Sequence, residues 1–375
     1  MKVIAFYLPQ FHEVEFNNKH HEKGFTEWTS LGRSKPLYEG HNAPRRPLNE
    51  NYYNLEDDNV KAWQIELAQR GGVYGFCMYH YWSNGDLLLE RPVEQWLKNK
   101  SLDFPFCLSW ANHPWSQHLT GGNRKLIRDQ KYGKEKEWEA HFDYLLPYFQ
   151  DKRYIQEDNK PVFVIYRPND IPRLNERLDY YTKLAKKNGL DGITFVFQDP
   201  FYANNKNSDV SRFTYGIEFQ PAYAIQNLRN PIDLFIRKMG GKVVNKLISI
   251  LGHQINVGAK KLEVLSYDDI WKKILTHKPT TDKMLPGAFN DWDNTPRTKE
   301  FGLSLSGVTS EKFENYMTEL VKKTRDEYKK DYIFFTAWNE WAEGCYLEPD
   351  TKAKYSYLDA MHSALKATSE LPGKK

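Results

Sequence analysis

The sequence predicts an α/β protein built as a single (β/α)8 TIM barrel, and three observations support this fold. Short apolar segments rich in β-branched and aromatic residues alternate with segments of helical character, and eight apolar segments occur. Continuous apolar strands joined by helices are typical of a parallel sheet covered on both faces. Nearly all of the chemically reactive residues follow directly on these segments, as they do at the carboxyl end of a barrel.

The expected strands are residues 3–7, 74–81, 105–109, 162–166, 193–198, 216–219, 284–289 and 332–337. Helices are expected at residues 59–69, 93–98, 136–149, 174–188, 267–275, 310–329 and 355–366. Asp57 and a capping box at 266–269 mark two helix starts, and Gly189 marks an end. The alternative is an open doubly wound sheet. A GxGxxG turn is missing after the first strand, which disfavours a dinucleotide-binding version of it.

Two stretches do not fit the repeat. Residues 8–56 are rich in Asn, Pro and aromatic residues, and we expect an irregular loop that forms a partial lid or rim, with Glu27 and Trp28 on the rim if it folds inward. Residues 225–264 mix cationic and apolar residues, which predicts an inserted helical pair on the barrel flank; a membrane-surface or partner-binding element is the alternative. We expect one domain over residues 1–368 and a tail at 369–375.

Composition excludes several classes of protein. The formal charge of +4 is spread over 53 basic and 49 acidic residues, so no basic stripe predicts nucleic-acid binding. The first apolar run is too short for a signal peptide or a membrane span. Three widely spaced cysteines form neither a disulfide framework nor a metal-binding pair, which indicates a reducing, cytoplasmic compartment. No metal and no cofactor are expected, and any membrane association would be peripheral, through residues 225–264.

The strongest candidate site follows the last expected strand, where Glu340 and Glu343 lie close together. Two neighbouring carboxylic acids can divide into a proton donor and a proton acceptor, because each anion raises the pKa of the other. Indole rings supply apolar faces for sugars, and an amide can bind a hydroxyl group. A content of 11 Trp and 24 Tyr fits a cleft that stacks on sugars. The plainer alternative is a buried strand and a polar loop whose aromatic residues fill the core.

Further candidates for binding substrate come from the same strand ends: Tyr7, His80, Tyr81, Trp82, Trp110, Asn112, Trp115, Tyr166, Asp291, Trp292, Asn294, Arg297, Trp338, Asn339 and Trp341. His80 is equally compatible with a core histidine. Asp291 and Asp293 have the spacing of a metal-diphosphate site, but we expect them to bond Arg297 and hydroxyl groups at the rim.

The sequence NEWAEG at 339–344 resembles the catalytic signature of glycoside hydrolase family 99. An ordered set of further segments looks like its WbsX-like, or family-99-like, branch over nearly the whole chain: residues 5–12, 24–28, 74–77, 79–82, 89–92, 104–107, 160–163, 293–297 and 338–350. The sequence departs from the hydrolases at Ala342, where they often have His, so the sugar subsite should differ.

The resemblance implies a metal-free barrel that acts on mannose-type or related sugars of surface polysaccharides. It implies that Glu340 deprotonates the sugar's own 2-hydroxyl, which attacks the anomeric carbon and gives a 1,2-anhydro sugar. Glu343 would protonate the leaving oxygen and later activate water. We therefore expect a retaining hydrolase or transglycosylase acting on an oligosaccharide or lipid-linked glycan. The alternatives are a glycosyltransferase of O-antigen or capsular polysaccharide synthesis that uses an activated donor, and a non-catalytic glycan-binding protein.

Overall fold

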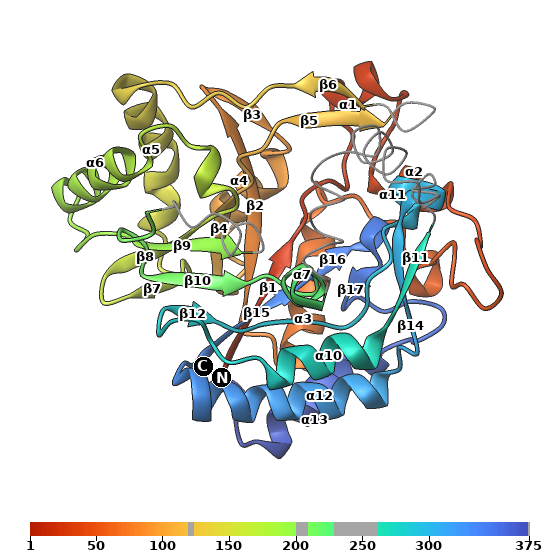
Figure 1. Ribbon diagram of the computed structural model, residues 1–375. Helices are drawn as coiled ribbons and strands as arrows, with labels where there is room; N and C mark the ends of the chain where they lie inside the picture. The colour runs from red at the N-terminus through yellow and green to blue at the C-terminus, as the bar shows by residue number, and fades with distance from the viewer. Residues whose placement is uncertain (119–123, 200–208, 229–261, 374–375) are drawn as a thin grey trace, which may run out of the picture.

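A computed structural model describes residues 1–118, 124–199, 209–228 and 262–373. Its central sheet contains eight parallel barrel strands in chain order (Figure 1). They are β1 (Lys2–Tyr7), β2 (Gly75–Ser83), β4 (Phe106–Trp110), β8 (Lys160–Ile165), β9 (Thr194–Asp199), β10 (Tyr215–Glu218), the split strand β12 (Met284–Leu285) and β13 (Gly287–Phe289), and β15 (Tyr332–Thr336). Each expected strand is present within a few residues of its predicted bounds. The (β/α)8 barrel is therefore confirmed.

The barrel closes through its seventh strand, which is divided at Pro286. On one side of the division β12 pairs with β10, and on the other β13 pairs with β15. Proline has no backbone N–H to donate, but its carbonyl accepts a hydrogen bond from Phe334 N at 3.1 Å. The prediction of one continuous strand at 284–289 therefore missed this division.

Seven expected helices are present with small boundary shifts: α3 (Asp58–Gly71), α4 (Arg91–Lys98), α5 (Glu135–Phe149), α6 (Leu174–Lys187), α10 (Tyr267–Thr276), α12 (Ser310–Lys323), which continues as a π-helical turn (Thr324–Tyr328), and α13 (Ser356–Ala367). Asp57 and Ser266 act as the predicted N-caps, since they accept from Asn59 N and Asp269 N. Of the capping box predicted at 266–269, the structure shows this one bond. Between β9 and β10 the structure describes only residues 209–214, and these contain no helix.

The long loop after β1 is more ordered than the sequence predicted. It contains two short helices, α1 (Glu15–His20) and α2 (Glu27–Gly32), and a 3-10 turn (Leu48–Glu50). Helix α2 lies against α11 (Thr295–Thr298) and the 3-10 turn η6 (Trp341–Glu343), as Figure 1 shows for α2 and α11. The loop therefore folds inward over the carboxyl end of the barrel, as a rim should.

Short strand pairs complete this end of the molecule. They are β3 (Asp86–Leu88) on β2, the hairpin of β5 (Trp115–His118) and β6 (Arg124–Arg128), the parallel pair β11 (Glu263–Ser266) and β14 (Leu303–Ser306), and the pair β16 (Asn339–Glu340) and β17 (Cys345–Tyr346); β7 (Gln156–Glu157) pairs with β8 instead. None of these pairs was predicted.

Of the stretch 225–264, the structure describes only the end of α7 (Ala222–Leu228) and the segment beginning at Leu262. The expected helical pair lies outside the described residues. No helix within the described ranges has the length and apolar character needed to span a bilayer.

Candidate active site

One arginine joins three carboxylates at the carboxyl end of the barrel. Arg297, on α11, donates through Nη1 to Glu343 Oε1 at 2.5 Å. Its Nη2 contacts Glu27 Oε1 at 2.6 Å and Glu340 Oε2 at 3.3 Å. The side chains of Arg297 and Glu343 are 32% and 25% exposed, so the cluster opens to solvent, whereas Glu340 at 9% and Glu27 at 2% lie deeper. The two glutamates expected to be catalytic therefore share one cation at an accessible surface.

The local backbone explains why the two glutamates converge. The pairing of β16 with β17 folds residues 339–346 into a tight hairpin, with Glu340 opposite Cys345. Gly344 ends the turn with φ of 66°, a conformation that favours glycine. A side chain at Gly344 would also lie 2.8 Å from the backbone N of Asp293. The glycine of the NEWAEG sequence is thus required both by its dihedral angle and by its close neighbour.

Burial gives the two glutamates an unusual proton affinity. Desolvation, followed by the negative charge of Glu343, raises the pKa of Glu340 to about 8, and Arg297 only partly opposes this. Desolvation also raises the pKa of Glu343 above its ordinary value. Because the two carboxyl groups interact, they titrate as a pair. The deeper position and the longer contact to Arg297 favour Glu340 as the residue that keeps a shared proton.

A second buried carboxylate network lies behind this hairpin. Glu348 accepts from Trp341 Nε1 at 2.7 Å, Tyr53 OH at 2.8 Å and Gln64 Nε2 at 2.7 Å. Asn339 holds the end of β1, accepting from Leu8 N at 2.7 Å and donating to Leu8 O at 3.0 Å. Asn339 and Trp341, which were expected to bind sugar, are therefore buried and support the backbone on either side of Glu340. Trp338 is fully buried as well.

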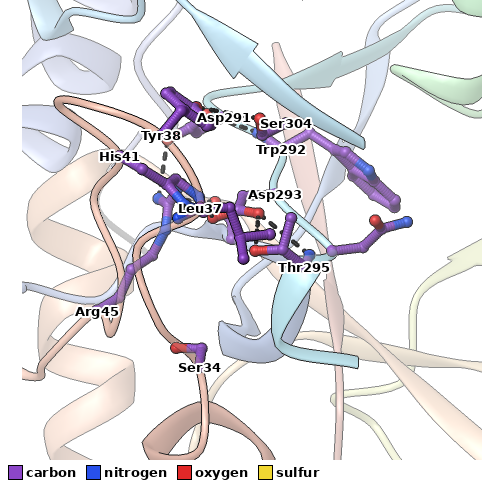
Figure 2. Close-up of polar contacts among 12 residues, drawn as sticks. Ser34, Leu37, Tyr38, His41, Arg45, Asp291, Trp292, Asp293, Thr295 and Ser304 are labelled. Carbon is purple, nitrogen blue, oxygen red and sulfur yellow. Dashed lines mark hydrogen bonds and ion pairs between the residues drawn. The ribbon is translucent and has the colours of Figure 1, made fainter. Parts of the chain in front are cut away.

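The two aspartates that follow the seventh strand lie beside Arg45 and His41 (Figure 2), and this cluster holds the loop that carries Glu343. Asp291 accepts from Arg45 Nη1 at 2.8 Å, and Asp293 contacts His41 Nε2 at 3.0 Å. The backbone N of Asp293 donates to Glu343 O at 2.7 Å, and Arg45 Nη1 donates to Gly344 O at 3.2 Å. The expectation that Arg297 pairs with these aspartates was wrong, since their cation is Arg45.

His41 acts as a neutral link in this cluster. Its Nδ1 accepts from Leu37 N at 3.1 Å, so the proton of the ring lies on Nε2 and is donated to Asp293. Thr295 donates to the other oxygen of Asp293 through its N at 3.1 Å and its Oγ1 at 2.7 Å. Hydrogen bonds from the protein therefore occupy the carboxylate oxygens of Asp291 and Asp293, which a metal-diphosphate site would need as ligands.

Strand β2 directs alternate side chains to opposite sides. Tyr79 and Tyr81 lie in the electrostatic field of Glu340, whose charge contributes to raising the pKa of each hydroxyl, after burial itself. His80 lies on the other side, with its Nε2 2.9 Å from His141 Nε2 on α5, and Trp82 stacks on the same His141. Tyr81 is therefore placed near the glutamates, and His80 and Trp82 are not. The sequence reasoning missed Tyr79, although strict alternation along β2 would have found it.

The remaining candidates divide in the same way. Tyr166 and Trp115 are half-buried at the mouth, with the Trp115 ring 5.2 Å from Tyr81. Trp110 is buried beneath Arg177, and Tyr7 bonds Gln64 between barrel and helices.

Asn112 is buried and directs its amide to the backbone of Arg167. Trp292 is half-buried, and Asn294 accepts from Leu303 N at 2.8 Å. The structure thus brings Glu340, Glu343, Arg297, Tyr81, Tyr166 and Trp115 to the mouth of the barrel.

Proteins of known sequence resemble this chain along most of its length. A family model described as Glycosyltransferase WbsX matches residues 3–361. Two relatives from Xanthomonas campestris pv. campestris, each described as Uncharacterized protein WxcX, are 30% identical over 366 residues, or 97% of this chain. The chain spans 49% of the length of those relatives.

Solved structures share the fold. A GH99 endo-alpha-mannosidase from Bacteroides thetaiotaomicron superposes with a TM-score of 0.56 at 12% identity, over 98% of each chain. A glycoside hydrolase-like protein gives a TM-score of 0.57 at 11% identity, over 100% of this chain and 94% of the other. At such low identity these likenesses show the fold alone, whereas the sequence match along almost the entire chain shows that it belongs to the WbsX glycosyltransferase family.

Proposed function

We propose that this protein is a carbohydrate-active enzyme that cleaves or transfers a glycosidic bond in a mannose-type or related surface-polysaccharide glycan. The observation that carries the proposal is the convergence of Glu340 and Glu343 on Arg297 at the mouth of the barrel. Burial raises the pKa of both carboxyl groups, that of Glu340 to about 8, which supports the proton exchange that a general acid and base require. Half-buried aromatic residues beside them, Trp115 and Tyr166, suit the faces of sugar rings.

The mechanism we propose proceeds with retention through the sugar's own 2-hydroxyl. Glu340 takes the proton of the 2-hydroxyl while the oxygen of that hydroxyl attacks the anomeric carbon. The glycosidic bond breaks at the same time, and the leaving oxygen takes a proton from Glu343. Water then attacks the anomeric carbon of the 1,2-anhydro sugar and gives a proton to Glu343. The bond between the anomeric carbon and the sugar's 2-oxygen breaks, and the 2-oxygen takes back the proton held by Glu340. A sugar hydroxyl as acceptor in place of water gives transfer.

For these roles, substrate has to make Glu343 the carboxyl group that holds the proton and Glu340 the one that is ionised. Without substrate, the greater burial of Glu340 favours its protonated form. A 2-hydroxyl that donates a hydrogen bond to Glu340 stabilises the ionised form, and a glycosidic oxygen beside Glu343 stabilises the protonated form of that residue. Binding would therefore move one proton from Glu340 to Glu343, and Arg297 contacts whichever of the two carboxylates is ionised.

A glycosyltransferase that uses an activated donor is the second candidate, and the family description favours it. If Asp291 and Asp293 bound a metal and a diphosphate, they would first have to release Arg45 and His41. Calorimetric titration with nucleotide sugars, with and without Mg²⁺ or Mn²⁺, separates the candidates. Metal-dependent binding of a nucleotide sugar would favour the transferase, and binding of oligosaccharide alone would favour the hydrolase or transglycosylase.

The paired-glutamate mechanism is tested by the variants Glu340→Gln and Glu343→Gln. Each should lower the rate of glycoside cleavage or transfer by a factor of about 10²–10⁴, the usual contribution of a general acid or base. The melting temperature should change little, because Gln keeps the shape of the side chain. Glu319→Gln, exposed on α12, is the matched control and should keep full activity. Full activity in either active-site variant would refute the assignment.

A further inference from the structure

The mouth of the barrel carries opposite charges on its two sides. Glu27, Glu340 and Glu343 lie on one side around Arg297. On the other side Arg167 directly follows β8, and its guanidinium lies 5.4 Å from the centre of the Tyr166 ring. Charges on both sides affect the pKa of the Tyr166 hydroxyl. Burial raises this pKa most, the positive charge of Arg167 lowers it, and the negative charges of Glu343 and Glu340 raise it. Tyr166 therefore lies between the cationic side and the glutamates.

A buried amide fixes the backbone of Arg167. Asn112 donates from Nδ2 to Arg167 O at 2.7 Å and accepts at Oδ1 from Arg167 N at 2.8 Å. The hydroxyl of Tyr132 supports the same Asn112, with its oxygen 3.3 Å from Nδ2 and donating to Asn112 O at 3.1 Å. Asn112 is fully buried, so the chain uses a buried polar group to hold an arginine whose own side chain is 34% exposed. These bonds fix the backbone from which the Arg167 side chain extends, so less of the chain has to be ordered when a ligand binds there.

The pKa of His113 reflects the positive charges on this side of the mouth. Its ring lies 5.2 Å from the Tyr166 ring. Burial, and then the positive charges of Arg167, Arg128 and Arg297, lower the pKa of His113 to about 4. Arg128 is held by Asp86 at 3.0 Å, whereas the pair between Arg167 and the exposed Asp170 is long, at 3.7 Å. A long pair that solvent can reach adds little stability, so Asp170 itself competes weakly with an anionic ligand.

From these contacts we propose that the side of the mouth formed by Arg167, His113 and Tyr166 binds an anionic, oxygen-rich substituent of the glycan, a carboxylate or a phosphate. The inference rests on the proposed function, because it places the sugar ring between Tyr166 and the glutamates. Arginine suits this role because its planar N–H groups match the two oxygens of a carboxylate or phosphate. Neutral mannose chains would fill the same site without using Arg167.

The test compares three mannotetraoses: one neutral, one with a single mannuronic acid residue, and one with a single 6-phosphate. Each is titrated by calorimetry into the whole protein and into Arg167→Gln, Arg167→Lys and Arg325→Gln. Arg325 belongs to the π-helical turn and bonds Asp326, so it is a control for the loss of one surface charge. We expect at least one anionic glycan to bind about tenfold more tightly than the neutral one, with the difference shrinking as salt increases.

Arg167→Gln should abolish this preference and leave the affinity for the neutral glycan unchanged. Arg167→Lys should keep part of it, and Arg325→Gln all of it. The carboxylate and phosphate arms identify the source of the anion. An equal preference in wild type and Arg167→Gln, or no binding of any of the three glycans, overturns the inference. Turnover of these glycans without a preference for the anionic ones would refute the inference and leave the proposed function standing. Tighter binding of an anionic glycan without turnover would support the anion site and count against the proposed function.

Discussion

At the scale of single residues, the site depends on how many carboxylates share one cation. Arg297 contacts Glu27, Glu340 and Glu343, so at most one of three negative charges is neutralised by it. Glu27 is the most buried of the three and also accepts from Ala342 N at 3.2 Å, which ties α2 to the hairpin that carries the other two. A shared proton on Glu340 or Glu343 relieves the remaining repulsion. Burial, together with this surplus of acid, thus explains why a proton is held here near neutral pH.

Glu348 gives a prediction about stability that is independent of catalysis. Desolvation raises its pKa to about 7, although Trp341, Gln64 and Tyr53 donate to it. The unfolded chain releases this proton near its ordinary pKa of 4.5, so the folded protein binds more protons between that pH and 7. Stability should therefore fall as pH rises through this window, by up to about 3 kcal/mol.

Glu348→Gln removes this titration. Urea unfolding at about pH 5 and about pH 8 measures the free energy of unfolding of both proteins. The difference, variant minus wild type, should be larger at pH 8 than at pH 5 by up to about 3 kcal/mol. Glu319→Gln serves again as the control for a lost surface carboxylate. Parallel stability curves for Glu348→Gln and wild type would contradict the prediction.

At the scale of elements, side-chain alternation separates residues of the site from residues of the core. Along β2, Tyr79 and Tyr81 are directed toward the glutamates, and His80 and Trp82 pack on α5. Trp82 Nε1 donates to Glu137 Oε1, which is partly buried. The two sides of one strand should therefore respond differently to loss of a single polar group.

Tyr81→Phe should lower kcat/KM and change the free energy of unfolding by less than about 0.5 kcal/mol. Trp82→Phe should instead lower the free energy of unfolding by about 1–3 kcal/mol, because Glu137 loses a donor, and should leave kcat/KM within a few-fold. Thermal melts and initial rates on the same glycan measure both effects. Loss of activity without loss of stability in Trp82→Phe would show that Trp82 faces the substrate after all.

The same alternation shows which parts of the molecule can be predicted from sequence. The strands were located correctly because each is a short apolar run between polar turns, a pattern that needs no knowledge of the fold. The directions of His80 and Tyr81 were also within reach, since period two assigns neighbours to opposite sides.

Other features were not available from local pattern. That Asp293 pairs with His41, and that Glu27 reaches Arg297, depend on how the long loop after β1 folds back on the barrel. Trp110 and Asn112 were expected in the site because of their side-chain chemistry, but buried indole and amide groups also serve as internal supports. Only tertiary contacts distinguish these two uses.

At the scale of the whole molecule, the barrel has to close for the eighth strand to place Glu340 beside α11. Closure occurs where β12 and β13 pair with different neighbours. At this point the backbone of Gly287 passes so close to Glu218 that a Cβ atom would lie 2.0 Å from its carbonyl oxygen and 3.1 Å from Gln220 Cγ. The carbonyl belongs to the backbone of β10 and cannot rotate away. The seventh strand and β10 can therefore approach this closely only because residue 287 has no side chain.

Gly287→Ala should consequently destabilise the protein by about 3 kcal/mol or more, because the two strands must separate to make room for the methyl group. Activity should fall with it even at temperatures where the variant is folded, since displacement of β13 is transmitted to β15 and to the hairpin that follows. Gly32→Ala is the matched control: this glycine ends α2, nothing lies within 4 Å of a Cβ there, and the change should stay within about 1 kcal/mol. Denaturant unfolding and initial rates on the same samples measure both quantities. If Gly287→Ala unfolds like the control, the barrel does not depend on this close approach.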